Sequence, residues 1–284
     1  MKFYLTVLMP YALFNQQLIK EEDLKLSFQN RGFLYGDGFF ETILFANNEL
    51  RFFTAHYNRL CKAAKASNIV LPASISSENL EQQIVALIGK NELVRMQRIR
   101  ITCWRSGMGL YTPEANMAEV LITNSQGTIA PSSKQNVGVF TDMYKPYSTL
   151  SFCKTLSANI YVQASIARQA LEVDDMIILG ANKIIAECCS SNIFFIQNNI
   201  LSTPAIESGC IDGIMRNEIL KWCAENGIHC TEVMITMDEL SQVEMAFTAN
   251  VTGLSSIASI AGVHYQTSHQ IYERLKEKFN LTPQ

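Results

Sequence analysis

Two hydrophobic spacings alternate along the chain. Short runs rich in β-branched and aromatic residues predict strands, and apolar residues that recur every three or four positions predict amphipathic helices. The predicted strands cover residues 1–4, 17–19, 39–45, 50–53, 98–103, 118–123, 137–140, 176–179, 183–187, 192–196, 200–202, 231–236, 244–249 and 255–260. The predicted helices cover residues 55–67, 76–89, 155–171, 213–226 and 267–279. This mixture predicts an α/β (α+β) protein.

A stretch rich in Ser, Gly and Pro divides this pattern into two halves. It runs from residue 124 to residue 136, and such composition is typical of a linker. A chain of 284 residues fits one large domain or two of ordinary size. We therefore predict an N-terminal α/β domain over residues 1–123, a linker over 124–136 and a C-terminal domain over 137–284.

The composition and net charge of the chain argue against nucleic acid and membranes as partners. The chain is 48% hydrophobic and 17% charged, which fits a globular protein with a sizeable core, and its net charge of −3 gives no electrostatic reason to expect nucleic acid or an anionic membrane. No apolar run approaches the ~20 residues of a membrane span. The apolar start of the chain contains Pro10 and lacks a cleavage site, so we predict no signal peptide and a cytoplasmic protein.

Cysteine and histidine add little chemistry. The eight cysteines form no C-x-x-C pair, so we predict reduced thiols that are mostly buried. The four histidines are scattered without the spacing of metal ligands, so we predict no metal site.

Residues 154–216 contain three groups suited to an aldehyde cofactor that carries a pyridine ring and a phosphate. Lys154 precedes a long apolar helix, and partial burial would lower its pKa and make it a nucleophile. Glu187 ends an apolar strand, where a carboxylate is costly unless it faces a donor such as a protonated pyridine nitrogen. Gly213, Ile214 and Met215 open a helix, whose free N–H groups attract phosphate.

Each of these features also has a structural explanation. An isolated lysine usually lies on the surface, and a carboxylate at the end of a strand is often exposed or paired in a salt bridge. The helix start at Gly213 can be capped by Asp212, whose charge would discourage an anion. Taken singly, the structural explanation is the better one in all three cases.

The first half of the chain holds two further blocks. Residues 31–42 read Arg-Gly-Phe-Leu-Tyr-Gly-Asp-Gly-Phe-Phe-Glu-Thr, and their three glycines suggest unusual backbone near a ligand or a tight crossing of strands. His56 and Arg59 are three residues apart and so share one face of a predicted helix. In isolation, Arg59 would be interpreted as a solvated charge.

Together and in this order, the blocks resemble the class IV (fold type IV) pyridoxal-phosphate aminotransferases. That family includes branched-chain and D-amino-acid aminotransferases and aminodeoxychorismate lyase. The resemblance runs from about Phe14 to Ile260. It makes the functional explanation the better one for the features that, taken singly, were better explained by structure. It implies two α/β domains with pyridoxal 5′-phosphate in the cleft between them, held mainly by the C-terminal domain, and a homodimer that acts on a small amino-acid-like substrate.

The resemblance also implies residue roles. Lys154 would be the Schiff-base lysine and then the general base. Glu187 would bind the pyridine nitrogen and keep it protonated, so that the ring can withdraw electrons. The phosphate contacts implied are Arg59, the N–H groups of Ile214 and Met215, and Asn250, where many relatives have threonine. The substrate-pocket residues implied are Phe40, Glu41, Arg105 and Tyr111.

Local features favour different members of the family. The blocks Glu187-Cys188-Cys189 and 213–216 favour aminodeoxychorismate lyase, an enzyme of folate biosynthesis that forms 4-aminobenzoate and pyruvate, and Tyr111 matches a pocket tyrosine of some lyases. Glu41 is the residue that most aminotransferases carry, and Arg105 is displaced from the position of a carboxylate-binding arginine in some relatives.

We rank the lyase slightly ahead of an amino-acid aminotransferase that uses a 2-oxo acid acceptor. A protein that holds the cofactor without catalysis is disfavoured by the intact Lys154 and Glu187.

Overall fold

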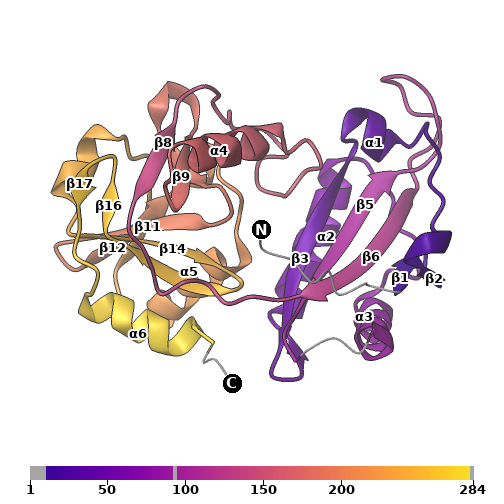
Figure 1. The fold of residues 1–284 in the computed structure, drawn as a ribbon, viewed down its shortest axis with the longest axis horizontal. Helices are drawn as coiled ribbons and strands as arrows, with labels where there is room; N and C mark the ends of the chain where they lie inside the picture. Colours follow the sequence, from indigo (N-terminus) through magenta and orange to yellow (C-terminus); the bar gives the residue numbers. More distant parts are fainter. Residues whose placement is uncertain (1–10, 92–94, 282–284) are drawn as a thin grey trace. The chain divides into compact units, whose positions relative to one another are not determined.

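The computed structural model describes residues 11–91 and 95–281, which form two compact units (Figure 1). The first unit comprises residues 1–128 and 153–157, and the second comprises residues 129–152 and 158–284. The strand predicted over residues 1–4 lies outside the described residues. The short segment 153–157 is therefore covalently part of the second half of the chain but packs in the first unit.

An antiparallel sheet forms the body of the first unit. Its strands, in the order β2-β1-β6-β5-β3-β4, are β2 (Gln17–Lys20), β1 (Tyr11–Phe14), β6 (Ala118–Gln126), β5 (Gln97–Arg105), β3 (Gly38–Ala46) and β4 (Glu49–Leu50). The two tight hairpins turn at Asn15-Gln16 and Asn47-Asn48, and all four residues have positive φ. Such turns match the right-handed twist of the strands they join.

Helices complete the first unit. They are α1 (Arg31–Tyr35), α2 (Phe53–Ala66), α3 (Ser77–Asn91) and the 3₁₀ turn η1 (Glu21–Asp23). Helix α2 packs on β3, and α3 packs on β1 and β6 (Figure 1). Apolar side chains from both layers, including Ile43, Leu60 and Ile84, are fully buried and form the core.

The helices of the first unit differ from the sequence prediction in three ways. Helix α1 was not predicted. Helix α2 begins at Phe53 and not at residue 55, and it follows Phe52, whose φ is +56° and whose side chain makes no capping bond. Helix α3 continues past Gly89 because the buried Asn91 amide donates to the Tyr11 carbonyl and to the Asn124 side chain.

The second unit contains two sheets. The first has the order β10-β9-β8-β16-β17 and comprises β10 (Ile185–Cys188), β9 (Asp175–Leu179), β8 (Val137–Phe140), β16 (Ser259–Ile260) and β17 (Val263–His264). The second has the order β13-β12-β11-β14-β15-β7 and comprises β13 (Cys230–Val233), β12 (Ile200–Pro204), β11 (Asn192–Gln197), β14 (Met245–Asn250), β15 (Gly253–Ile257) and β7 (Ser133–Lys134). A shared core that includes Ile177, Ile193 and Phe195 lies between them.

Helices cover the outer faces of these sheets (Figure 1). They are α4 (Asn159–Ala170), α5 (Ile214–Glu225) and α6 (Gln270–Phe279), with 3₁₀ turns η2 (Ala181–Lys183), η3 (Ile206–Ser208) and η4 (Asp238–Gln242). Helix α4 packs on β8 and β9, α5 packs on β14, and α6 packs on β15. The unit therefore has four layers, and the predicted mixture of helices and strands is confirmed.

Segment 153–157 explains why α4 begins later than predicted. The Phe40 N–H donates to the Lys154 carbonyl over 2.8 Å, and the Leu156 N–H donates to the Gly38 carbonyl over 2.9 Å, so this segment lies along β3 in extended form. The helix starts only at Asn159, and Leu171, the last residue of the predicted helix, lies beyond its end and is exposed. The expected linker, in turn, contains the end of β6 and all of β7.

Gly38 shows what the glycine-rich block does. A Cβ at this position would lie 2.2 Å from the Cys103 carbonyl oxygen, so β3 and β5 cross too closely for any other residue. Within residues 11–91 and 95–281, none of the helices is both long and apolar enough to span a membrane.

Candidate cofactor site

Lys154 is held on β3 through its backbone. Its side chain is half-buried, and its Nζ lies 5.7 Å from the centroid of the Phe40 ring. Phe152 and Cys153, just before it, are buried. The extended pairing with β3 therefore fixes where the amine of Lys154 emerges in the first unit.

Arg59 is not a solvated helix charge, because it is only 6% exposed. Its Nε and Nη2 donate to the two carboxylate oxygens of Glu41, each over 2.7 Å. The His56 Nδ1 is 2.7 Å from Glu41 Oε2. These three residues form one buried cluster between β3 and α2.

Burial and the neighbouring charges shift the pKa values of both Glu41 and His56 in this cluster. Burial alone would raise the pKa of Glu41, but the Arg59 charge and the hydrogen bonds from Arg59 and His56 hold it at about 2. Burial lowers the pKa of His56 despite the neighbouring carboxylate. His56 is thus a neutral imidazole that donates from Nδ1, and its buried Nε2 has no hydrogen-bond partner among the described residues.

The structure does not bring Phe40 and Glu41 together. Successive residues of a strand point to opposite faces, so Glu41 points to the buried helical side and Phe40 to the half-buried side where Lys154 lies. Of the two predicted pocket residues, only Phe40 shares a face with the candidate amine.

Arg100 is a residue that the sequence interpretation missed. It pairs with Thr42 in the β3–β5 register and is therefore a diagonal neighbour of Phe40. Its guanidinium carbon lies 3.7 Å from the Phe40 ring centroid, and its Nε donates to Thr102 Oγ1. Arg100 is half-buried and contacts no carboxylate among the described residues. The alternating pattern of the predicted strand 98–103 assigns Arg100 to one face of that strand. The sequence does not show that Phe40, on another strand, lies against it.

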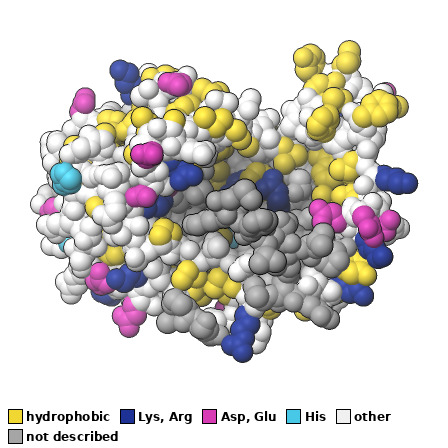
Figure 2. All heavy atoms as spheres, viewed as in Figure 1, with side chains coloured by type: hydrophobic (Ala, Val, Ile, Leu, Met, Phe, Trp, Pro, Cys, Tyr) yellow, Lys and Arg dark blue, Asp and Glu magenta, His cyan; other side chains and the backbone are white. Residues whose placement is uncertain are grey.

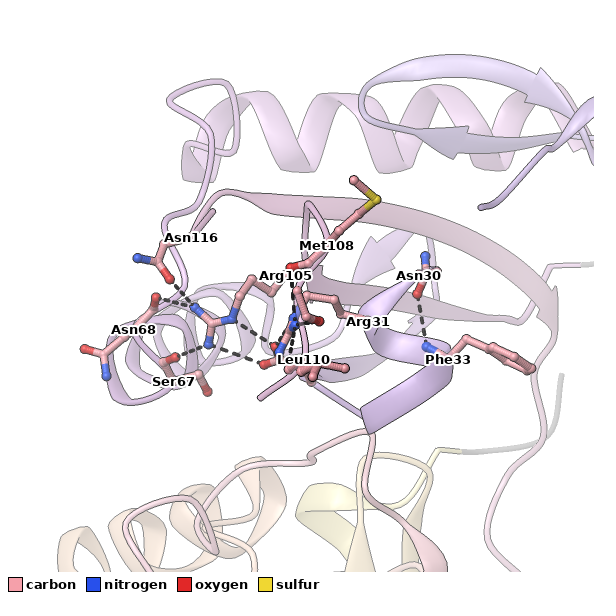
Figure 3. A network of polar contacts seen from close by, with 11 residues as sticks. Asn30, Arg31, Phe33, Ser67, Asn68, Arg105, Met108, Leu110 and Asn116 are labelled. Carbon is pink, nitrogen blue, oxygen red and sulfur yellow. Dashed lines mark hydrogen bonds and ion pairs between the residues drawn. The ribbon is translucent and has the colours of Figure 1, made fainter. Parts of the chain in front are cut away.

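Arg105, unlike Arg100, is surrounded by hydrogen-bond acceptors (Figure 3). Its Nε and Nη2 donate to Asp37, its Nη1 to the Asn68 carbonyl and the Asn116 side chain, and its Nη2 also to the Ser67 carbonyl. A guanidinium has five N–H groups, and these bonds use all of them. The geometry favours a structural role for Arg105 over contact with a substrate carboxylate.

Asp37 also accepts from Arg31, whose Nη1 donates to the carbonyls of Met108, Gly109 and Leu110 (Figure 3). Although burial opposes ionisation, the two arginines lower the pKa of Asp37. This network ties α1 to the loop between β5 and β6.

Tyr111 lies on that loop and is 91% exposed. Its ring is tilted against the ring of Tyr35, with centroids 5.8 Å apart. Figure 2 shows hydrophobic side chains gathered over α1 and this loop, and Phe33 and Leu110 are exposed there too. The structure therefore places Tyr111 on the surface of the first unit, in contact with Tyr35.

In the second unit, Glu187 is 2% exposed, and both of its carboxylate oxygens accept hydrogen bonds. Its Oε1 accepts from Lys145 Nζ and from the Tyr161 hydroxyl, each over 2.6 Å, and its Oε2 accepts from the Ile211 N–H over 3.0 Å. Glu187 is therefore a buried, paired carboxylate and not an exposed strand end.

The start of α5 is open to an anion. Its N-cap is Gly213, which gives no side-chain capping bond to the N–H groups of the first turn, to which Ile214 and Met215 belong. Asp212 instead accepts from the Asn217 side chain. A Cβ on Gly213 would lie 1.9 Å from Asn192 Oδ1, so only glycine allows this close approach. The hydrogen bond from the Asn217 side chain to Asp212 does not involve the N–H groups that the predicted Asp212 cap would use.

Two more side chains lie at the turns next to this helix start. Ser191 Oγ is buried and has no hydrogen-bond partner among the described residues. Asn250 donates from Nδ2 to the Ser190 carbonyl and accepts with Oδ1 from the N–H and hydroxyl of Thr252. Asn250 thus joins two turns, and its phosphate contact remains a prediction.

A family model for amino-transferase class IV matches residues 38–260 of the chain. The chain belongs to this class IV aminotransferase family. It is similar to D-alanine aminotransferase of Bacillus licheniformis, with 27% identity over 260 residues that cover 88% of each chain.

Solved structures agree on the fold. The branched-chain aminotransferase of Thermoproteus uzoniensis matches with a TM-score of 0.85 and 22% identity, covering 95% of this chain and 93% of that one. A protein of Legionella pneumophila assigned as a 4-amino-4-deoxychorismate lyase matches with a TM-score of 0.80 and 21% identity, covering 90% and 94%. Identities this low establish the fold, and the expected fold type IV architecture is confirmed.

Class IV aminotransferases use pyridoxal phosphate, so this chain is a pyridoxal-phosphate-dependent enzyme. Its residues fit that cofactor. The uncapped start of α5 and the unpartnered Ser191 hydroxyl can donate to a phosphate, and the buried Glu187 can accept from a protonated ring nitrogen. The described residues contain no cluster of side chains able to hold a metal.

Proposed function

We propose that the chain is an amino-acid aminotransferase that passes the amino group to a 2-oxo acid. The observation that carries the proposal is the arrangement on Phe40, where the Lys154 amine and the Arg100 guanidinium contact one ring in the first unit. An amino acid needs a base near its Cα and a cation for its carboxylate. Lys154 and Arg100 provide this combination on one face of the sheet.

Each residue then has a role. Bound pyridoxal phosphate supplies an electron sink for the amino acid. Lys154 would hold the cofactor aldehyde and then move the proton at the substrate Cα. Glu187 would keep the ring nitrogen protonated, while the α5 N–H groups, Ser191 and Arg59 would bind the phosphate. Arg100 would bind the substrate carboxylate in place of Arg105, whose N–H groups are all used.

Transfer is favoured over elimination by two observations. Glu41 is the residue most aminotransferases carry, and here it orients Arg59 through two hydrogen bonds. The D-alanine aminotransferase of Bacillus licheniformis is similar over most of the chain. These observations reverse the order in which the sequence alone ranked the two reactions.

Aminodeoxychorismate lyase is the second candidate. The blocks Glu187-Cys188-Cys189 and 213–216 support it, because they resemble that branch more than the aminotransferases. The predicted homodimer also remains a proposal, and the exposed hydrophobic side chains of Phe33, Leu110 and Tyr111 support it.

A paired assay separates the two reactions. Purified protein loaded with pyridoxal phosphate is given 2-oxoglutarate with D-alanine or with a branched-chain amino acid, and glutamate is measured. In parallel it is given aminodeoxychorismate, and 4-aminobenzoate is measured. Pyruvate alone is not diagnostic, since D-alanine also yields it. The proposal predicts glutamate without 4-aminobenzoate. The reverse result would establish the lyase and overturn the proposal.

A further inference from the structure

A second lysine lies on the proposed ring-binding carboxylate. Lys145 Nζ and the Tyr161 hydroxyl both donate to Glu187 Oε1 over 2.6 Å, and Lys145 Nζ is also 5.3 Å from the centroid of the Tyr161 ring. Lys145 was not among the residues that the sequence singled out. Its side chain is 12% exposed, which is unusual for lysine and requires a paired charge.

The backbone around Lys145 is fitted closely. Its N–H donates to the Leu179 carbonyl over 2.8 Å. A Cβ added at Gly209 would lie 2.5 Å from the Lys145 carbonyl oxygen, and Gly209 has a φ of +91° that other residues rarely adopt. A Cβ added at Gly180 would lie 3.4 Å from the same oxygen. The contact between Lys145 and Glu187 therefore rests on a fixed backbone and not on a mobile surface chain.

Lys145 supplies the positive charge in contact with Glu187 in this unit. Titratable groups near the carboxylate include Tyr161 and the thiols of Cys188, Cys189 and Cys210, and Arg216 acts on Cys210 as well. Burial raises the pKa of Cys189 and of Cys210 to about 11 and raises that of Cys188 well above its ordinary value. Burial, reinforced by Glu187, raises the pKa of Tyr161 well above 10. All four stay uncharged near neutral pH.

The carboxylate still has room for one more donor. A carboxylate offers about four acceptor positions, two on each oxygen. On Oε1 both are used, by Lys145 and Tyr161, whereas on Oε2 only one is used, by the Ile211 N–H. A protonated ring nitrogen can therefore bind Oε2 without displacing Lys145.

We propose that Lys145 is a positioning residue that orients Glu187 and keeps a positive charge against it, and that it stays on the carboxylate when the ring nitrogen binds. The inference rests on the proposed role of Glu187 in the cofactor site. Its consequence is electrostatic. A fixed cation that shares the carboxylate disfavours a second positive charge, so the bound cofactor loses its proton at a lower pH than it would beside an unshared glutamate.

The test is the pH at which the visible absorption band of the bound cofactor changes. Lys145→Met removes the charge, and the transition should move upward by about 1–2 pH units, the size expected for one nearby charge in a protein interior. Lys145→Arg keeps the charge and should restore the transition to within about 0.3 units of the wild type. An unmoved transition in Lys145→Met would overturn the proposal, because it would mean that Lys145 leaves the carboxylate when the cofactor binds.

A matched control is available in the same unit. Lys134 is also a buried lysine paired with a carboxylate, Asp175, whose other oxygen accepts from the N–H groups of Met176 and Cys189. Lys134→Met has a comparable structural cost and should leave the transition unmoved. An equal shift in both variants would mean that general loosening, and not the charge of Lys145, moves the transition.

Two further measurements keep the outcomes distinct. Lys145→Gln removes the charge but keeps a hydrogen-bond donor, so it should give the same upward shift if Lys145→Met fails to fold. If the wild-type protein binds no pyridoxal phosphate and shows no absorption band to titrate, the proposed function itself is rejected, whatever the role of Lys145. A normal wild-type band with no shift in either charge-removing variant would overturn the role of Lys145 alone.

Discussion

In the first unit, the two buried arginines of the predicted site are already paired, although the buried Nε2 of His56 has no hydrogen-bond partner among the described residues. Arg59 is held by Glu41, and Arg105 uses all its N–H groups on Asp37 and neighbouring groups. In the second unit, hydrogen-bonding capacity remains unfilled. The start of α5 has no side-chain cap, Ser191 Oγ has no partner among the described residues, and Glu187 Oε2 keeps one free acceptor position.

The difference indicates that the two units contribute differently. Under the proposed function, the second unit would receive the phosphate and the ring nitrogen, because unfilled donors and acceptors are costly when buried and a ligand would complete them. The first unit provides rigid support, the amine of Lys154 and the cation of Arg100. Variants in each unit should therefore fail in different ways.

The largest effect on turnover is expected from Glu187→Gln in the second unit. A neutral amide cannot keep the ring nitrogen protonated, so turnover should fall by about 10²–10³-fold. The phosphate contacts are untouched, so the variant should retain the cofactor. Single-turnover kinetics of the loaded protein measure the rate, and near-normal turnover would contradict the assigned role.

A smaller effect, on binding, is expected from Gly213→Ala. The new Cβ would lie 1.9 Å from Asn192 Oδ1 and would displace the side chain that donates to the Ile211 carbonyl. We expect a loss of about 10–100-fold in affinity for pyridoxal phosphate, the worth of one or two charge-assisted hydrogen bonds. Fluorescence titration of the cofactor-free protein measures it.

The control is Gly89→Ala in α3, where an added Cβ meets nothing within 4 Å. It should leave the affinity unchanged and stabilise the helix slightly. Equal losses in both variants would remove the special role assigned to Gly213.

The first unit should respond mainly in stability. Glu41 has a pKa of about 2 in the folded protein against an ordinary value of 4.5. Its stabilising contribution is therefore fully present above about pH 4.5 and is lost as the pH falls toward 2. Glu41→Gln should lower the free energy of unfolding by about 3 kcal/mol at pH 7 and flatten this part of the pH profile.

Urea unfolding between pH 3 and pH 7 checks this expectation. Glu81→Gln, a change at an exposed position of α3, is the matched control and should keep the wild-type profile. A Glu41→Gln profile as steep as that of the wild type would mean that the Glu41–Arg59 pair does not carry the acid dependence.

The elements with strong periodicity could be predicted from the sequence, and so could the residues that belong to ordered motifs. Helix α5 and strands β8, β9, β11 and β12 lie close to their expected bounds, because local spacing determines them. Helix α4 starts late because residues 153–157 pair with β3, more than a hundred residues earlier in the chain. No local pattern reports such a partner.

Site residues follow the same division. Lys154 and Glu187 could be proposed from the sequence because their neighbours form recognisable blocks. Arg100 and Lys145 were missed because their importance comes from Phe40 and Glu187, which are distant in sequence. Arg105 was given a substrate role because the sequence does not show that Asp37, 68 residues away, occupies its guanidinium. The partner of a charged side chain is a property of the tertiary structure.

The central claim is that Lys154 is the lysine that holds pyridoxal phosphate. The most direct test is borohydride reduction of the loaded protein, followed by proteolysis and mass spectrometry of the modified peptide. The account predicts a single pyridoxyl adduct on Lys154, with Lys145 unmodified on Glu187. An adduct on Lys145 or on another lysine, or no adduct in a protein that carries the cofactor, would contradict it.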